Sequence, residues 1–264
     1  RDLRMSRGLG DVYKRQVYME PVGPESGTTP ITVEYVKGVE RLCRKYGALL
    51  VFDEVVTGFR IGMAGAQGYF GVSPDLTIFG KVIAGGYPGA GGIGGKREYM
   101  KYLGAGLDSS GKKIHKALVG GTMTANPLSC CAGYFTLEEI ERTNACQKAG
   151  QMGDRICAGL KELVKKHGLP FVVWNTGSIC HLETVGTMHY QINWKKPWEI
   201  PAILGETGVR QKEMEHMGAA YMAEGLVTLA GSRLYTSAAY TPKMIDQALA
   251  CFDRVFENVA VKAD

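Results

Sequence analysis

The chain has 264 residues, of which 45% are hydrophobic, 22% charged and 9% aromatic. This balance is typical of a globular protein and excludes a disordered, collagenous or coiled-coil chain. No apolar run approaches the roughly 18 residues of a membrane span, and no apolar region follows the basic N-terminus, so we expect neither membrane insertion nor export. The seven cysteines include no C-x-x-C pair, which argues against a disulfide framework or a zinc ribbon and favours a cytoplasmic location.

Residues 1–16 carry most of the net charge of +5, because they hold five basic and two acidic side chains. They lack the periodicity of a helix or a strand, and we interpret them as a non-native leader. No basic stripe with interleaved aromatic residues follows them, so the sequence predicts no nucleic-acid partner.

From Val17 onward, short apolar runs alternate with amphipathic stretches, a pattern typical of an α/β fold with a parallel sheet. The dense glycines between Gly85 and Gly95 exclude a helix there. In chain order we predict a strand at 17–20, a helix at 31–46, strands at 48–52 and 76–79, and a helix from Pro127 to about Glu141 with Asn126 as its N-cap.

Residues 17–144 are expected to form part of a larger domain, and residues 145–264 a smaller α+β domain. Asn144 is the expected N-cap of a helix that ends at His167-Gly168. Strands are expected at 171–174, 179–182 and 226–229, with a helix near 209–224 and a final helix that begins at Thr241-Pro242.

Two polar residues stand at the carboxyl ends of predicted strands, where open α/β sheets bind their ligands. Asp53 follows the strand at 48–52, and Lys81 follows the strand at 76–79 with a glycine before it. Taken singly, they could be a loop carboxylate and a solvated lysine. Together they suit pyridoxal phosphate, whose chemistry needs a lysine amine for a Schiff base and a carboxylate that keeps the pyridine nitrogen protonated.

Several segments carry a resemblance to a known family. They are Glu20-Pro21-Val22, the D-E-V-x-T-G-F-R pattern at 53–60, the segment 66–76 followed by Gly80-Lys81, and the G-T-x-x-x-N-P-L pattern at 121–128. Their order and spacing resemble the class III aminotransferases, and within that family they are most similar to the glutamate-1-semialdehyde 2,1-aminomutase branch. The resemblance implies a fold-type I pyridoxal-phosphate transferase, an α/β fold with a mostly parallel large-domain sheet and a smaller C-terminal α+β domain.

The resemblance also implies the roles of single residues. Lys81 is the Schiff-base lysine and proton carrier, Asp53 pairs with the pyridinium nitrogen, and Val55 packs on one face of the ring. Thr122 contacts the cofactor phosphate of a partner subunit, so the site requires a homodimer. Glu20 ends another strand near the cofactor and is a candidate substrate contact.

Two departures from the family pattern concern the substrate, a small amino acid or amino-aldehyde. Val56 stands where many class III transaminases have glutamine, which favours the aminomutase-like branch. Arg233 lies in a segment that lacks the glutamate of the aminomutases; its guanidinium suits a substrate carboxylate, and a surface or salt-bridged arginine is the other interpretation. The alternative function is an ω- or β-amino acid transaminase that uses a separate keto-acid acceptor.

Family members are longer than this chain, so the resemblance implies a C-terminal fragment that lacks the phosphate loop and the ring-stacking aromatic residue and is catalytically incomplete. Other sites are not indicated, because Lys81 lies in no Walker A motif and the glycines at 85–95 form no dinucleotide fingerprint. We predict no metal site, since the histidines lack ligand spacing: His115, His181, His189 and His216.

Overall fold

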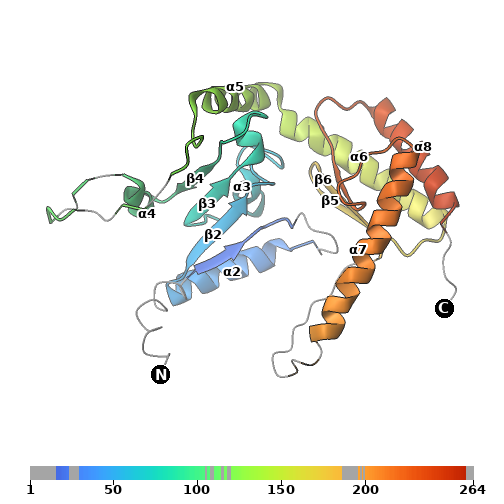
Figure 1. The fold of residues 1–264 in the computed structure, drawn as a ribbon, viewed down its shortest axis with the longest axis horizontal. Helices are drawn as coiled ribbons and strands as arrows, with labels where there is room; N and C mark the ends of the chain where they lie inside the picture. The colour runs from blue at the N-terminus through green and yellow to red at the C-terminus, as the bar shows by residue number, and fades with distance from the viewer. Residues whose placement is uncertain are drawn as a thin grey trace. The chain divides into compact units, whose positions relative to one another are not determined.

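The structure, a computed structural model, describes residues 16–23, 30–104, 106–107, 110–113, 116–117, 120–185, 196, 198 and 200–259. It divides the chain into two compact units (Figure 1). The first contains residues 31–144 with the segment before Gly23, and the second contains residues 145–264 with residues 23–30. Apart from Gln16, the predicted leader lies outside the described residues, as do His115 and His189.

A four-stranded sheet forms the centre of the first unit, in the order β1-β2-β3-β4. The parallel strands β1 (Gln16–Met19), β2 (Leu49–Glu54) and β3 (Leu76–Phe79) confirm the three predicted strands. The sequence does not predict the antiparallel β4 (Gly92–Gly95), because glycine has a low strand propensity. Glycine is nevertheless needed there, since a Cβ on Gly95 would stand 2.6 Å from the Asp75 carbonyl oxygen.

Helix α2 (Val33–Tyr46) begins and ends at residues that favour its termini. The Thr32 hydroxyl accepts a hydrogen bond from the Tyr35 N–H, and Gly47 adopts a left-handed conformation after the last turn. Val36 and Cys43 are buried on its apolar face, as the predicted helical periodicity requires.

Helix α5 (Pro127–Thr143) begins at its predicted cap, where the Asn126 side chain accepts a hydrogen bond from the Ser129 N–H. Asn144 closes this helix in the left-handed conformation that asparagine tolerates, with a φ of 52°, and the next helix begins directly after it at Ala145. The remaining helical segments of the unit are too short to show a periodicity in the sequence: α3 (Gly65–Phe70), the 3-10 turn η1 (Lys81–Ala84), α4 (Arg97–Met100) and the 3-10 turn η2 (Lys101–Leu103).

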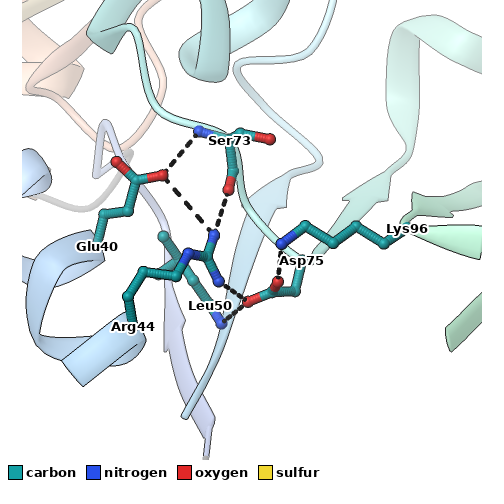
Figure 2. Close-up of polar contacts among 6 residues, drawn as sticks. All are labelled: Glu40, Arg44, Leu50, Ser73, Asp75 and Lys96. Carbon is teal, nitrogen blue, oxygen red and sulfur yellow. Dashed lines mark hydrogen bonds and ion pairs between the residues drawn. The ribbon is translucent and has the colours of Figure 1, made fainter. Parts of the chain in front are cut away.

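The Asp75 carboxylate joins several elements of the first unit (Figure 2). Its Oδ2 accepts hydrogen bonds from the Leu50 N–H of β2 at 2.8 Å and from Arg44 of α2 at 2.6 Å, and its Oδ1 accepts one from Lys96, after β4, at 2.6 Å. Although burial favours the neutral acid, these donors together hold the pKa of Asp75 below its ordinary value. Arg44 also donates to the Ser73 carbonyl and so fixes the loop before β3 to α2.

The second unit combines an antiparallel sheet, in the order β5-β6-β7, with three long helices. The sheet residues Val173, Leu182 and Leu234 share a buried core with Leu160 and Phe252 from two of the helices. In chain order the elements are α6 (Ala145–Lys166), β5 (Val172–Thr176), β6 (Ile179–Glu183), α7 (Ile200–Ala223), β7 (Arg233–Tyr235) and α8 (Pro242–Glu257). Within the described parts of the chain, we find no helix whose length and apolar composition would let it cross a membrane.

Two predictions for the second unit are wrong in their placement. The third strand is β7, at Arg233–Tyr235, and not the apolar run at 226–229, of which Leu229 makes only an isolated bridge to Arg233. The Leu226 N–H instead donates to the Tyr221 carbonyl and closes the end of α7. This helix begins at Ile200, well before the predicted start at residue 209.

We predict that Asp75→Asn destabilises the protein, because an amide lacks the charge that pairs with Arg44 and Lys96. The free energy of unfolding at pH 7 should fall by about 1–3 kcal/mol, less than for a fully buried pair because both cations are partly exposed. Asp246→Asn, which breaks an exposed pair with Arg155, is the control and should cost less than about 1 kcal/mol. Urea denaturation measures both variants.

The pH dependence of this difference is a second test. The folded pKa of Asp75 lies below the unfolded value of about 3.9, so ionised Asp75 stabilises the protein above that pH and its contribution is lost as the pH falls through the folded pKa. The difference in unfolding free energy between wild type and Asp75→Asn should be constant between about pH 7 and 5 and should shrink below about pH 4. A difference that grows on acidification would contradict the assignment.

Candidate active site

The carboxyl ends of β2 and β3 meet at one edge of the first sheet, because the two strands are adjacent and parallel. In their register Asp53 lies opposite Ile78, and Glu54 lies opposite Phe79. Lys81 follows the end of β3 by two residues. The sheet therefore brings the predicted carboxylate and the predicted lysine to the same edge.

Both carboxylate oxygens of Asp53 accept hydrogen bonds, one from the neighbouring strand and one from the residue just after β2. The Val55 N–H donates to Oδ1 at 3.0 Å, and the Tyr18 hydroxyl of β1 donates to Oδ2 at 2.5 Å. The hydrogen bond to Asp53, with a smaller contribution from burial, raises the pKa of Tyr18 to about 12. The carboxylate is only half-buried, so it stays accessible to a ligand at this edge.

Val55 packs against the backbone that leads into Lys81. A Cβ placed on Gly80 would stand 3.1 Å from Val55 Cγ1, which is closer than most side-chain contacts. Glycine at this position therefore lets β3 end directly beside the branched side chain of Val55, which comes just after β2. Val55, the apolar residue predicted to face the cofactor ring, therefore lies beside the glycine that precedes the predicted Schiff-base lysine.

Lys81 has a backbone conformation that few lysines adopt. Its φ is 49°, in the left-handed region, which costs about 1–2 kcal/mol for a residue with a Cβ. Such strain persists where the surroundings impose it, and it occurs often at functional sites. The Lys81 side chain is exposed, so its amine can reach a ligand. No pattern in the sequence signals this conformation.

The turn that begins with Lys81 packs closely against α5. A Cβ on Gly133 of α5 would stand 2.0 Å from the Ile83 carbonyl oxygen, so backbone meets backbone here and only glycine fits. Further along the same loop, the Ser129 hydroxyl donates to the Pro88 carbonyl at 2.6 Å. These contacts hold the turn against a long helix.

Thr122 lies in the turn at 122–125 that precedes α5, and its side chain is exposed. The turn is joined to the loop after Lys81, because the Ala125 N–H donates to the Gly89 carbonyl at 3.3 Å. The start of α5 therefore positions both the lysine turn and the threonine turn.

Sequence reasoning missed the role of Glu54. This residue is fully buried, and its carboxylate accepts hydrogen bonds from the Thr57 hydroxyl at 3.0 Å, the Ala66 N–H at 2.6 Å and the Gln67 N–H at 3.2 Å. It joins the segment after β2 to the beginning of α3. A hydroxyl three residues after a carboxylate was a signal in the sequence for such a bond, although the partners in α3 were not foreseeable from spacing.

The other candidates have less direct links to this edge. Glu20 is half-buried and follows β1, and Val56 is buried beside Val55 in the chain. Arg233 is buried in β7 of the second unit, opposite His181 of β6. Among the residues that the structure describes, no three histidine, cysteine, aspartate or glutamate side chains group as metal ligands would.

Comparison with known proteins connects this geometry to a family. The family model for class III aminotransferases matches residues 16–230. A glutamate-1-semialdehyde 2,1-aminomutase of Shouchella clausii is 35% identical over 252 residues, which make up 93% of this chain and 53% of that protein. The chain thus spans about half the length of this curated relative.

Solved structures agree with the fold class predicted from the sequence. An ω-transaminase from Sphaerobacter thermophilus is similar with a TM-score of 0.74 and 22% identity, over 97% of this chain and 55% of that one. A β-phenylalanine aminotransferase from Variovorax paradoxus is similar with a TM-score of 0.73 and 21% identity, over 97% of this chain and 56% of that one. At such identities the likeness concerns the fold, and it confirms that class.

We predict that Gly133→Ala destabilises the protein by about 1–3 kcal/mol, because the new methyl group must displace the backbone of η1. Gly38→Ala in α2 is the matched control, since a Cβ there would meet nothing closer than 3.7 Å. That control should instead stabilise its helix by about 0.5–1 kcal/mol. Urea denaturation distinguishes the two, and equal effects would contradict the close packing of η1 on α5.

Proposed function

Since the chain belongs to the class III aminotransferase family, we propose that it carries the lysine site of a pyridoxal-phosphate-dependent enzyme, similar to glutamate-1-semialdehyde 2,1-aminomutase, that moves an amino group. The family resemblance found in the sequence is confirmed by the match over residues 16–230. The observation that carries the proposal for the site is the left-handed Lys81 at the sheet edge that also holds Asp53.

The residues at this edge fit the chemistry of pyridoxal phosphate. Lys81 offers an exposed amine, Asp53 keeps acceptor sites beyond its two hydrogen bonds, and Val55 offers an apolar surface beside Gly80. The cofactor, when bound, supplies an aldehyde for the lysine amine and a protonated ring that withdraws electrons from the substrate carbon.

Each residue then has a distinct task in this proposal. Lys81 holds the cofactor and, once displaced, carries a proton to and from the substrate carbon. Asp53 keeps the ring nitrogen protonated, and Val55 packs against one face of the ring. Thr122, at the exposed turn before α5, binds the phosphate of a cofactor held by a second copy, so we propose a homodimer.

The proposed substrate is a small amino acid or amino-aldehyde, with Arg233 and Glu20 as contacts because a guanidinium recognises a carboxylate and a carboxylate recognises an amine. A second candidate, also within the class III family, is an ω- or β-amino acid transaminase. The aminomutase moves the amino group within one molecule, whereas the transaminase needs a separate keto-acid acceptor.

Cofactor binding without amino transfer would identify a catalytically incomplete chain.

We also propose a cytoplasmic location. All seven cysteines have free thiols, as in proteins of a reducing compartment: Cys43, Cys130, Cys131, Cys146, Cys157, Cys180 and Cys251.

The first test of the function concerns Lys81. After incubation of the chain with pyridoxal phosphate, borohydride reduction and peptide mapping should find the cofactor label on Lys81. Lys81→Ala should lose this label, whereas Lys37→Ala, which removes an exposed lysine of α2, should retain it. A label that forms with equal yield on other lysines and survives in Lys81→Ala would refute the assignment.

The second test concerns Asp53. In Asp53→Asn the amide oxygen can still accept the Val55 hydrogen bond, so the fold should remain intact. In a full-length version of the protein, the single-turnover rate of amino transfer to bound pyridoxal phosphate should nevertheless fall by about 100-fold or more, because a neutral amide cannot keep the ring nitrogen protonated. Asp53→Glu should lower the rate of amino transfer less than Asp53→Asn does. A near-normal rate in Asp53→Asn would contradict the proposal and leave Asp53 with a structural role.

A further inference from the structure

The Tyr18 hydroxyl of β1 donates a hydrogen bond to Asp53 of the adjacent strand β2. In the register of β1 with β2, Tyr18 lies opposite Val51, and Asp53 is two residues further along β2 on the same face. Diagonal neighbours of this kind lie about 7–8 Å apart, which an aromatic side chain can span. The hydroxyl at the end of the ring therefore meets Asp53 Oδ2, at 2.5 Å.

We propose that Tyr18 is a positioning residue that orients the Asp53 carboxylate toward the ring nitrogen of the cofactor, an inference that rests on the proposed function. Tyr18 and the Val55 N–H donate to different oxygens of the carboxylate, so rotation about its Cβ–Cγ bond would break both hydrogen bonds. A carboxylate has about four acceptor sites, and those left over remain available to a ring N–H. Phenylalanine would have the same reach without the donor.

The phenol stays in its donating form at the pH of amino transfer. The hydrogen bond to Asp53, followed by burial and by the charges of Asp53 and Glu20, raises the pKa of Tyr18 to about 12. At neutral pH the hydroxyl therefore keeps its proton and donates a hydrogen bond to Asp53.

Packing alone gives little reason for a tyrosine at this position. The Tyr18 side chain is 56% exposed, so it removes little apolar surface from water. Tyr35 of α2 is 59% exposed and belongs to the same unit, which makes Tyr35→Phe a matched control for the loss of an exposed hydroxyl.

The hydrogen bond itself can be measured without cofactor. In protein with ¹³C-labelled tyrosine, Tyr18→Phe identifies the Tyr18 signal, whose titration should have a midpoint at about 12. In Asp53→Asn this midpoint should move toward the ordinary tyrosine value of about 10, because the charge that opposes ionisation is gone. A Tyr18 midpoint near 10 in the wild type would overturn the proposal.

The positioning role requires a second measurement. Tyr18→Phe should weaken the binding of pyridoxal phosphate about fivefold and lower the yield of borohydride labelling at Lys81, whereas Tyr35→Phe should change neither. A high Tyr18 midpoint together with unchanged binding and labelling in Tyr18→Phe would overturn the proposal while leaving the function standing. Failure of the wild type to label at Lys81 would overturn both, and the Tyr18 midpoint would then report only a structural hydrogen bond.

Discussion

A reciprocal pair of hydrogen bonds fixes the register between β2 and β3, and the geometry of the site depends on it. The Asp75 N–H donates to the Leu50 carbonyl at 2.7 Å, and the Leu50 N–H donates back to the Asp75 carboxylate at 2.8 Å. A slip of one residue would send every side chain of a strand to the other face. Arg44 and Lys96 donate to the same carboxylate, so the register is also coupled to α2 and to the segment after β4. This register places Asp53 opposite Ile78, one residue before the end of β3.

Close backbone contacts then determine the path of the chain beyond β3. Gly80 admits Val55 on one side, and Gly85 and Gly133 let the turn of Lys81 pack against α5 on the other. The left-handed conformation of Lys81 is unfavourable in isolation, so it is the contacts on both sides that keep it. A lysine whose backbone is fixed but whose side chain is exposed is suited to hold a cofactor and then release it.

The sequence predicts the elements that depend on neighbours along the chain. Asn126-Pro127 and Thr241-Pro242 start helices where capping rules place them. Composition alone identifies the strand that Lys81 follows and the strand that Asp53 is predicted to follow, although β2 extends past Asp53 to Glu54. Features that depend on partners distant in sequence are not predictable in this way. The run at 226–229 has strand-like composition, but β6 pairs with Arg233–Tyr235 instead. The hydrogen bond from Tyr18 to Asp53 likewise depends on the register of β1 with β2, and the spacing of residues along the sequence does not determine that register.

The adjacent carboxylates of Asp53 and Glu54 lie on opposite faces of β2 and therefore have different surroundings. Successive side chains of a strand point to opposite faces, so Glu54 enters the interior while Asp53 stays half-buried at the edge. Glu54 uses its acceptor sites for Thr57 and the start of α3, and it thereby stabilises the segment after β2. Within the described residues, Asp53 accepts hydrogen bonds from Tyr18 of its own sheet and from the residue just after β2, which leaves acceptor capacity for a ligand. In the proposed site, Glu54 would thus support the segment after β2 while Asp53 faces the cofactor, and exchanging the order of the two acids would put the acceptor of Asp53 into the core.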